Sequence, residues 1–176
     1  MVQIGAKPDS GFDDPIGMLT DCHRRIEQFL KILATVVERA RGRNLAGEEA
    51  AAVNAALQYF RTGGVRHTAD EEESLFPRLR AARATRSLAK LDGLETDHHT
   101  AAELHNSVEQ LYAEWIAQGL LPTDREQKLR SAMNRLTALY AAHIDIEESL
   151  VFPQAAQVLD HSAIASIGQE FRARRA

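Results

Sequence analysis

Hydrophobic side chains recur along this chain at alternating spacings of three and four residues, which is the period of an amphipathic α-helix. Asp14-Pro15 marks the start of the first such segment, because aspartate is a favoured N-cap and proline a favoured first helical residue. In the second segment, Pro77 is expected to kink the helix or to end its regular part. The predicted helices extend from Pro15 to before Gly42, over about residues 48–82 and 84–118, and from Thr123 to beyond Pro153, with a short helix from about Asp160.

Helix-breaking residues are rare, with 10 glycines and 5 prolines among 176 residues, whereas alanine, leucine, glutamate and arginine are abundant. These abundant side chains lose little conformational freedom in a helix, so the composition supports the helical pattern. Four long helices with short connections favour an all-α fold, an antiparallel up-down-up-down four-helix bundle with a short C-terminal helix. We expect a flexible N-terminal segment at residues 1–13, the bundle at 14–157, and the C-terminal helix packed on it at 158–176.

The charge and the cysteine content narrow the class of protein. A formal net charge of -4 argues against a general nucleic-acid binder, whose affinity for phosphate depends on clustered lysine and arginine. The single cysteine, Cys22, excludes an intramolecular disulfide. No apolar run approaches the roughly 20 residues that span a bilayer, and the polar first residues lack a signal-peptide core. We therefore expect a soluble cytoplasmic protein with neither nucleic acid nor a membrane as a partner.

A repeated motif, H-x3-E-E-x3-F-P, occurs towards the ends of the second and fourth predicted helices, and its second copy begins 76 positions after the first. His67 and Glu71 are four residues apart in the first copy, as are His143 and Glu147 in the second. Residues at this spacing stand on one face of a helix, and the hydrophobic stripe shows that this face points inward. Because an unpaired buried charge costs several kcal/mol, buried imidazoles and carboxylates in this pattern call for a bound partner.

His23 and His98 occupy inward positions of the first and third predicted helices. With the repeated motif they bring four imidazoles and two carboxylates to one level of the bundle. This set of ligands suits transition metals, and carboxylates are able to bridge two ions. A single inward histidine is more often a hydrogen-bonded core residue than a ligand, but six such residues in phase argue for a dinuclear site.

His23, His98 and the two motifs resemble the hemerythrin-like (HHE cation-binding) family over about residues 14–157. The resemblance implies a non-haem di-iron centre in a four-helix bundle, with two iron ions bridged by oxo or hydroxo groups. The E-x2-H spacing of ferritin-like di-iron bundles is absent from this chain. In the family pattern, the bridging residues are Glu71 and Glu147, and the terminal iron ligands are His23, His67, His98 and His143.

The chain departs from the oxygen-carrying members of that family, which have a further histidine one helical turn from the third-helix ligand. Leu94 and Ala102 stand at these positions here, so the resemblance implies a less saturated site, which weakens the case for reversible oxygen carriage. The implied function is to bind or sense dioxygen, peroxide or nitric oxide, or to handle iron, in oxidative or nitrosative stress. Two alternatives stay open: a di-iron enzyme (peroxide breakdown, nitric-oxide chemistry or iron-sulfur repair) and an iron-responsive interaction module.

Antiparallel packing predicts a second layer beside this site. Residues that follow His23 and His98 are expected to share a level with residues that precede His67 and His143. The members of that layer are Ile26, Leu30, Gly64, Ala101, Ala102, His105 and Tyr140.

The small residues of this layer, including Gly64, leave space, while His105 and Tyr140 supply an imidazole and a hydroxyl group. We expect a pocket for a small gaseous or peroxide ligand, with His105 or Tyr140 as a hydrogen-bond donor or an additional iron ligand. The alternative is a filled core in which these two side chains hydrogen-bond each other.

The remaining polar residues are expected on the surface. His99 lies about 100° from His98 around the helix and is predicted to be exposed or to lie behind the ligands, and His161 is predicted to be exposed. The other acids of the motifs are expected on a solvated face: Asp70, Glu72, Glu73 and Glu148. A weaker alternative is that they order nearby histidines or arginines. Three arginines near the C-terminus are expected to stabilise the dipole of the last helix: Arg172, Arg174 and Arg175.

Overall fold

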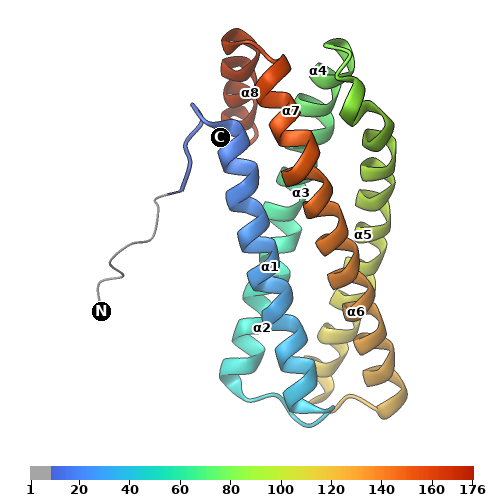
Figure 1. Cartoon of the computed structure of the whole chain (residues 1–176). Helices are drawn as coiled ribbons and strands as arrows, with labels where there is room; N and C mark the ends of the chain where they lie inside the picture. The colour runs from blue at the N-terminus through green and yellow to red at the C-terminus, as the bar shows by residue number, and fades with distance from the viewer. Residues whose placement is uncertain (1–8) are drawn as a thin grey trace.

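Four helical rods lie side by side in the computed structural model, which describes residues 9–176, and consecutive rods run in opposite directions (Figure 1). The first rod is α1 (Pro15–Ala40) and the third is α5 (Thr85–Gln118). The second rod joins α2 (Gly47–Tyr59), η1 (Phe60–Gly64), α3 (Val65–Ala69), η2 (Asp70–Leu75) and α4 (Phe76–Ala81). The fourth joins α6 (Thr123–Ile146), η3 (Glu147–Val151) and α7 (Phe152–Val158), and the shorter α8 (His161–Ala173) follows.

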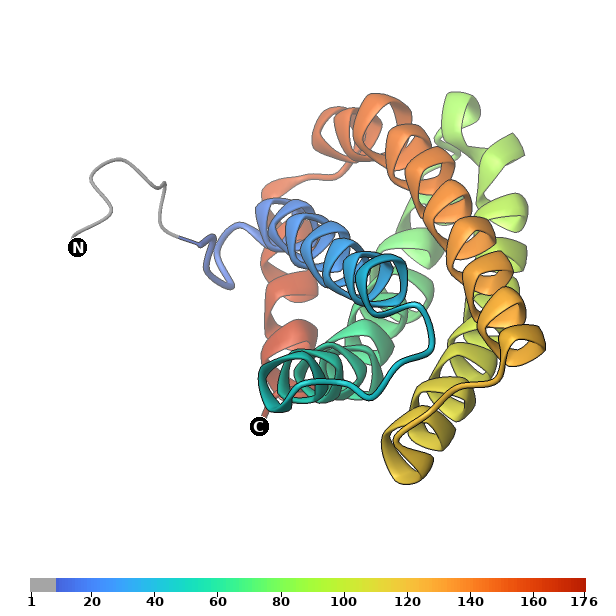
Figure 2. The same cartoon turned by 90° about the horizontal axis from the view of Figure 1, so that it is seen from below.

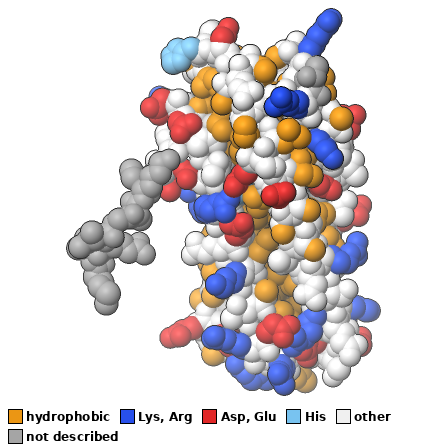
Figure 3. All heavy atoms as spheres, in the orientation of Figure 1, with side chains coloured by type: hydrophobic (Ala, Val, Ile, Leu, Met, Phe, Trp, Pro, Cys, Tyr) orange, Lys and Arg blue, Asp and Glu red, His pale blue; other side chains and the backbone are white. Residues whose placement is uncertain are grey.

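The described residues form helices and loops without a strand, so the predicted all-α bundle with a short C-terminal helix is confirmed. Seen from below, the four rods surround a shared interior (Figure 2). The Asp14 carboxylate caps α1 by accepting a hydrogen bond from the backbone N–H of Gly17 at 3.0 Å. No helix in residues 9–176 is long and apolar enough to cross a membrane. On the face shown in Figure 3, acidic and basic side chains are interspersed.

The second and fourth rods are continuous but not regular. Short π-helical turns, labelled η1, η2 and η3, interrupt them, and η2 and η3 each end one residue before the Phe-Pro pair of a repeated motif. Proline lacks a backbone N–H and its ring crowds the carbonyl four residues earlier, so a wider turn accommodates Pro77 and Pro153. The predicted irregularity at these prolines therefore takes the form of a wide turn, and Glu71 and Glu147 lie within these turns.

The hydrophobic core has two parts, separated by a layer of polar side chains. One part includes Ile26, Leu30, Val108, Trp115 and Leu136. The other, nearer α8, includes Leu19, Leu75, Phe76, Leu91 and Phe171. Along every rod the residues of the repeated motifs, or the inward histidine, stand between these two parts. The interruption falls at one level of the bundle, and the fold thus fixes the place of the polar site.

The segment that precedes α1 packs against α1 and α8. Gly168 of α8 lies against the backbone of Phe12, where an added Cβ would stand 1.9 Å from the carbonyl oxygen, so this close approach requires glycine. The backbone N–H of Ser10 donates to Asp21 at 2.6 Å, and Arg25 pairs with Asp9 at 2.7 Å. Of the segment predicted to be flexible, residues 1–8 lie outside the described residues, and residues 9–13 make these contacts.

Candidate metal centre

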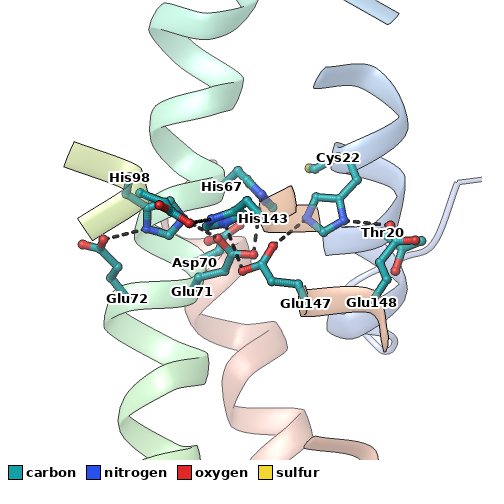
Figure 4. Close-up of polar contacts among 12 residues, drawn as sticks. Thr20, Cys22, His67, Asp70, Glu71, Glu72, His98, His143, Glu147 and Glu148 are labelled. Atoms are coloured by element: carbon teal, nitrogen blue, oxygen red, sulfur yellow. Dashed lines mark hydrogen bonds and ion pairs between the residues drawn. The ribbon is translucent and has the colours of Figure 1, made fainter. Parts of the chain in front are cut away.

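Six buried side chains meet in the polar layer (Figure 4). They come from all four rods: His23 of α1, His67 of α3, Glu71 of η2, His98 of α5, His143 of α6 and Glu147 of η3. Their nitrogen and oxygen atoms form two groups, and within each group the atoms lie within 4.8 Å of one another. One group contains His23 and His67, the other contains His98 and His143, and Glu71 and Glu147 belong to both. Two carboxylates shared between two groups of potential ligands are compatible with a bound cation in each group.

Imidazole and carboxylate atoms approach closely inside the groups without forming hydrogen bonds. Glu147 Oε2 lies 3.1 Å from His23 Nε2, and its Oε1 lies 3.3 Å from His143 Nε2. Glu71 lies 3.5 Å from His67 and 3.3 Å from His98. In the described residues, every buried side-chain nitrogen or oxygen without a hydrogen-bond partner belongs to these six residues.

Unsatisfied buried polar atoms are rare in folded proteins because each costs free energy. Their confinement to one cluster, with both oxygens of Glu71 and of Glu147 among them, fits a site whose partner is a cation. Imidazole nitrogen and carboxylate oxygen together suit iron, zinc or manganese. The residues present therefore fit the metal pair that the sequence predicts.

Three of the four histidines have a carboxylate behind the ring. His23 Nδ1–H donates to Glu148 at 2.8 Å, and His98 Nδ1–H donates to Glu72 at 2.7 Å. His143 Nδ1 lies 3.4 Å from Asp97, a weaker contact. A proton on Nδ1 leaves Nε2 as a lone pair that faces the cluster, and a carboxylate partner fixes the orientation of the ring.

The side chains of Glu72 and Glu148 are 30% and 32% exposed, so they are solvated only in part, and they also order histidines, which was the weaker alternative. Sequence reasoning missed Asp97, because an acid next to an inward histidine is a common surface residue. His67 differs from the other three histidines, since its buried Nδ1 has no partner.

Asp70 also lies buried rather than on a solvated face. Arg174 Nη1 contacts its Oδ1 at 2.9 Å, and Arg175 Nη2 contacts its Oδ2 at 2.5 Å. Arg174 also donates to Ser74 Oγ at 2.8 Å and contacts Glu73, whose side chain is exposed as predicted. The prediction that Arg174 and Arg175 serve the helix dipole is thus wrong in its main point, because a buried carboxylate requires a cationic partner.

The same contacts tie α8 to the site. Asp70 is the residue before Glu71 in η2, so the last helix is held directly against the turn that presents a predicted ligand. Arg172 instead lies over the Phe12 ring at 4.9 Å and is exposed.

The two central carboxylates have different proton affinities. Burial and the nearby Glu147 carboxylate raise the pKa of Glu71 well above its usual range. Burial acts in the same direction on Glu147, but contacts with His143 and His23 outweigh it and lower the pKa of Glu147. Burial, together with the His23 ring, lowers the pKa of His67 well below its usual range. In the absence of a cation, burial thus favours the uncharged forms of Glu71 and His67.

A cavity of about 310 Å³ adjoins the cluster between the second rod and α5. The predicted pocket residues Gly64, His105 and Tyr140 line it, together with Ala101 and Ala102. His105 Nε2 lies 3.0 Å from Tyr140 Oη, so the two side chains hydrogen-bond each other, as the filled-core alternative expected. They border a cleft that is open to solvent on one side, since the lining residues Val65, Ala102 and Asn106 are exposed. His98 also lines the cavity, which thus reaches one of the two groups.

The other histidines lie away from the cluster. His99 and His161 are exposed, as predicted. In the described residues, the groups of side chains suited to a cation do not include His105. Its ring packs against Phe60 at a centroid distance of 4.2 Å, with the two planes tilted by 35°. His105 therefore contributes to the cavity wall rather than to the set of close contacts.

Two comparisons place the chain among known proteins. A protein of Haemophilus influenzae, described as an uncharacterized protein, is 26% identical over 164 residues, which cover 93% of this chain and 91% of the relative. Residues 14–166 match the model of the hemerythrin HHE cation binding domain, and this range contains all six clustered side chains and the cavity. The chain belongs to the hemerythrin HHE cation-binding domain family.

Proposed function

We propose that this protein holds two iron ions and binds or senses dioxygen, peroxide or nitric oxide in the cytoplasm during oxidative or nitrosative stress. The observation that carries the proposal is the cluster of buried nitrogen and oxygen atoms that lack any hydrogen-bond partner. Membership of a cation-binding family supports the metal, and the mixed imidazole and carboxylate ligands favour iron among the metals that such a site accepts.

One ion would be held by His23 and His67, and the other by His98 and His143. Glu71 and Glu147 belong to both groups, so each of these carboxylates would contribute to holding both ions. Iron bound in this way supplies reversible coordination and electron transfer towards small oxygen- or nitrogen-containing molecules.

The chain's own residues orient the site and keep it dry. Glu148, Glu72 and Asp97 hold the rings of His23, His98 and His143 from behind, which fixes the nitrogen that faces the cluster. The two hydrophobic parts of the core close the layer on both sides. The cavity beside His98 offers a route for a small molecule, and the Tyr140 hydroxyl group would form a hydrogen bond with that molecule there.

Metal content tests the proposal. Protein purified without oxygen and reconstituted with ferrous iron is expected to hold about two irons per chain and to develop charge-transfer absorption on exposure to air. The measurement is elemental analysis combined with an absorption spectrum of the reduced and the air-exposed samples. Protein that binds zinc alone, or that stays metal-free after reconstitution, would contradict the proposal and favour an interaction module.

The carboxylates behind the histidines give a second prediction. Glu72→Gln is expected to weaken iron binding by about 10- to 100-fold, because the amide no longer holds the His98 ring as a charged acceptor. The affinity is measured by competition with a chelator. Glu103→Gln serves as the control and should match the wild type. Glu103 is an exposed acid of α5, the helix that carries His98. Equal affinities for Glu72→Gln and the wild type would show that the contact does not orient the ligand.

Tyr140→Phe tests the polar pair in the cavity. Loss of the hydroxyl is expected to change azide affinity or the rate of reaction with peroxide about tenfold, the size of a hydrogen bond to a charged group. Tyr112→Phe is the matched control, because Tyr112 donates to the backbone of Leu33 far from the cavity. An unchanged iron spectrum together with unchanged azide and peroxide reactivity in Tyr140→Phe would remove Tyr140 from the proposal.

A further inference from the structure

The cavity beside the cluster is much larger than the diatomic and peroxide molecules of the proposed function require. Its volume is about 310 Å³, whereas a cavity of roughly 150 Å³ is enough to bind benzene and a water molecule takes up about 30 Å³ in the liquid. A diatomic molecule would leave most of this space to water. The volume instead lies at the lower end of the range found for sites that bind small organic molecules.

Apolar side chains form much of the cavity wall. Leu57, Phe60 and Ala101 are apolar, and Gly64 leaves a further stretch of wall without a side chain. Among the polar lining residues, which also include Thr68 and Asn106, His105 and Tyr140 form a hydrogen-bonded pair. Because either ring nitrogen of a neutral histidine carries the proton, Tyr140 Oη is able to donate to a bound molecule or to accept from it. A hydroxyl or hydroperoxyl group, which does both, matches this position.

The hydrogen-bonded pair inside the cavity is uncharged at neutral pH. Burial lowers the pKa of His105 to about 4, so the ring is neutral. Burial, together with the Glu71 carboxyl, raises the pKa of Tyr140 above its usual value, so the hydroxyl stays protonated. Arg61 and Glu109 line the rim and pair with each other at 2.8 Å, so their charges compensate. A charged molecule would lose its hydration there without gaining a counter-ion, which favours an uncharged occupant.

We propose that this cavity binds an uncharged organic molecule with a hydroxyl or hydroperoxyl head group and an apolar body about the size of a substituted benzene. The head group contacts the pair formed by His105 and Tyr140, and the body lies along Leu57, Phe60 and Gly64 towards His98. The binding itself requires only the residues of the cavity, while its link to iron chemistry rests on the proposed function.

Gly64 makes the proposal testable without a cavity-forming substitution. A Cβ added there would meet Phe60 at 3.5 Å, an ordinary contact, and the backbone of Gly64 is helical, so Gly64→Leu introduces a side chain without backbone strain. Gly93→Leu is the matched control. Gly93 is an exposed residue of α5, and an added Cβ there meets no atom within 4 Å. Both substitutions replace a helical glycine with a good helix former, so they share the expected effect on helix stability.

The probe is 2-phenyl-2-propanol, the stable alcohol that corresponds to an organic hydroperoxide, and benzoate is its charged counterpart. Binding to the metal-free full-length protein is measured by an NMR titration that follows the backbone amides of Gly64, Ala101 and His105. We expect saturable binding of the alcohol, at least about tenfold weaker binding of benzoate, and at least about tenfold weaker binding of the alcohol to Gly64→Leu than to Gly93→Leu. Absence of binding, equal binding of benzoate, or equal loss in both variants would overturn the proposal.

A second arm uses iron-loaded protein and follows azide binding by absorption. The alcohol is expected to compete with azide in the wild type and in Gly93→Leu, but not in Gly64→Leu. Iron-loaded protein that binds azide while no form binds the alcohol would overturn the cavity proposal and leave the iron proposal intact. Metal-free protein that binds the alcohol but never takes up iron would overturn the iron proposal and leave the cavity proposal intact.

Discussion

Glu71→Gln is expected to abolish binding of the metal pair while leaving the metal-free protein as stable as the wild type, or more stable. Glu71 contributes to both groups of close nitrogen and oxygen atoms, so its loss weakens both metal positions at once. An amide is nearly the same size as a carboxylate but neutral, and it is a poor ligand for a divalent ion. We expect iron affinity to fall by more than about 100-fold, beyond the range for removing a partner that lies behind a ligand.

The expected stability of the metal-free variant follows from the state of Glu71. Its side chain is fully buried, and both oxygens lack hydrogen-bond partners. Burial and the neighbouring Glu147 raise its pKa, so the metal-free protein favours the neutral form of this carboxyl. Replacing it with a neutral amide should therefore change the free energy of unfolding by no more than about 1 kcal/mol. A residue that contributes to ligand binding and not to the stability of the fold is expected to give this result.

Two measurements decide this prediction: metal content after reconstitution, and urea unfolding of the metal-free proteins. Asp145→Asn is the control, because Asp145 is an exposed acid within the second repeated motif. It should retain the wild-type metal content. His67→Ala gives an intermediate case, since His67 belongs to one group only and the group with His98 and His143 stays complete. Wild-type metal content in Glu71→Gln would rule out a bridging role for Glu71.

Sequence periodicity was sufficient to predict the inward residues of the site. The i, i+4 spacing of His67 and Glu71 and the stripe through His98 follow from helix geometry, and these residues meet in the cluster although Glu71 lies in the wide turn η2. The same periodicity predicts that Gly64 and Tyr140 share a level in the bundle, and both line the same cavity.

Helical periodicity does not predict the side-chain contacts of the wide turns η2 and η3, where the helix is no longer regular. Glu72 stands in the wide turn η2 one position after Glu71, yet both carboxylates contact the His98 ring, one on each nitrogen. In a regular helix, consecutive residues point about 100° apart and do not share a target. Glu148 has the same relation to His23 as a neighbour of Glu147. A π-helical turn has no signature in the spacing of hydrophobic residues, so these contacts lay outside the prediction.

The contacts of α8 were not predictable for a different reason. The three charges of Asp70, Arg174 and Arg175 meet only because the last helix folds back onto η2, more than a hundred residues away in the chain. Sequence alone shows an acid in an acidic run and arginines near a C-terminus, and for each the surface interpretation is the common one. Their pairing is a tertiary fact, and it leads to a second prediction with a large effect.

Arg174→Ala/Arg175→Ala is expected to destabilise the metal-free protein far more than Asp70→Asn does. The Asp70 side chain is 0% exposed, whereas those of Arg174 and Arg175 are 19% and 22% exposed. Removing both arginines leaves a buried carboxylate without a cation, which costs about 3–5 kcal/mol. Removing the carboxylate charge leaves two arginines that turn towards water, so Asp70→Asn should cost only about 1–2 kcal/mol.

Urea unfolding of the metal-free variants measures both losses of stability. Arg172→Ala is the control, because Arg172 is exposed and its side chain lies over the Phe12 ring rather than against Asp70. Its loss should be no more than about 1 kcal/mol. The decisive protein is the triple variant that combines Asp70→Asn with both arginine substitutions. If the buried charge causes the loss, the triple variant should recover most of the stability missing from the double variant, because the two changes are coupled through one contact. A triple variant as unstable as the double variant would instead assign the loss to packing of the arginine stems against Phe171 and η2.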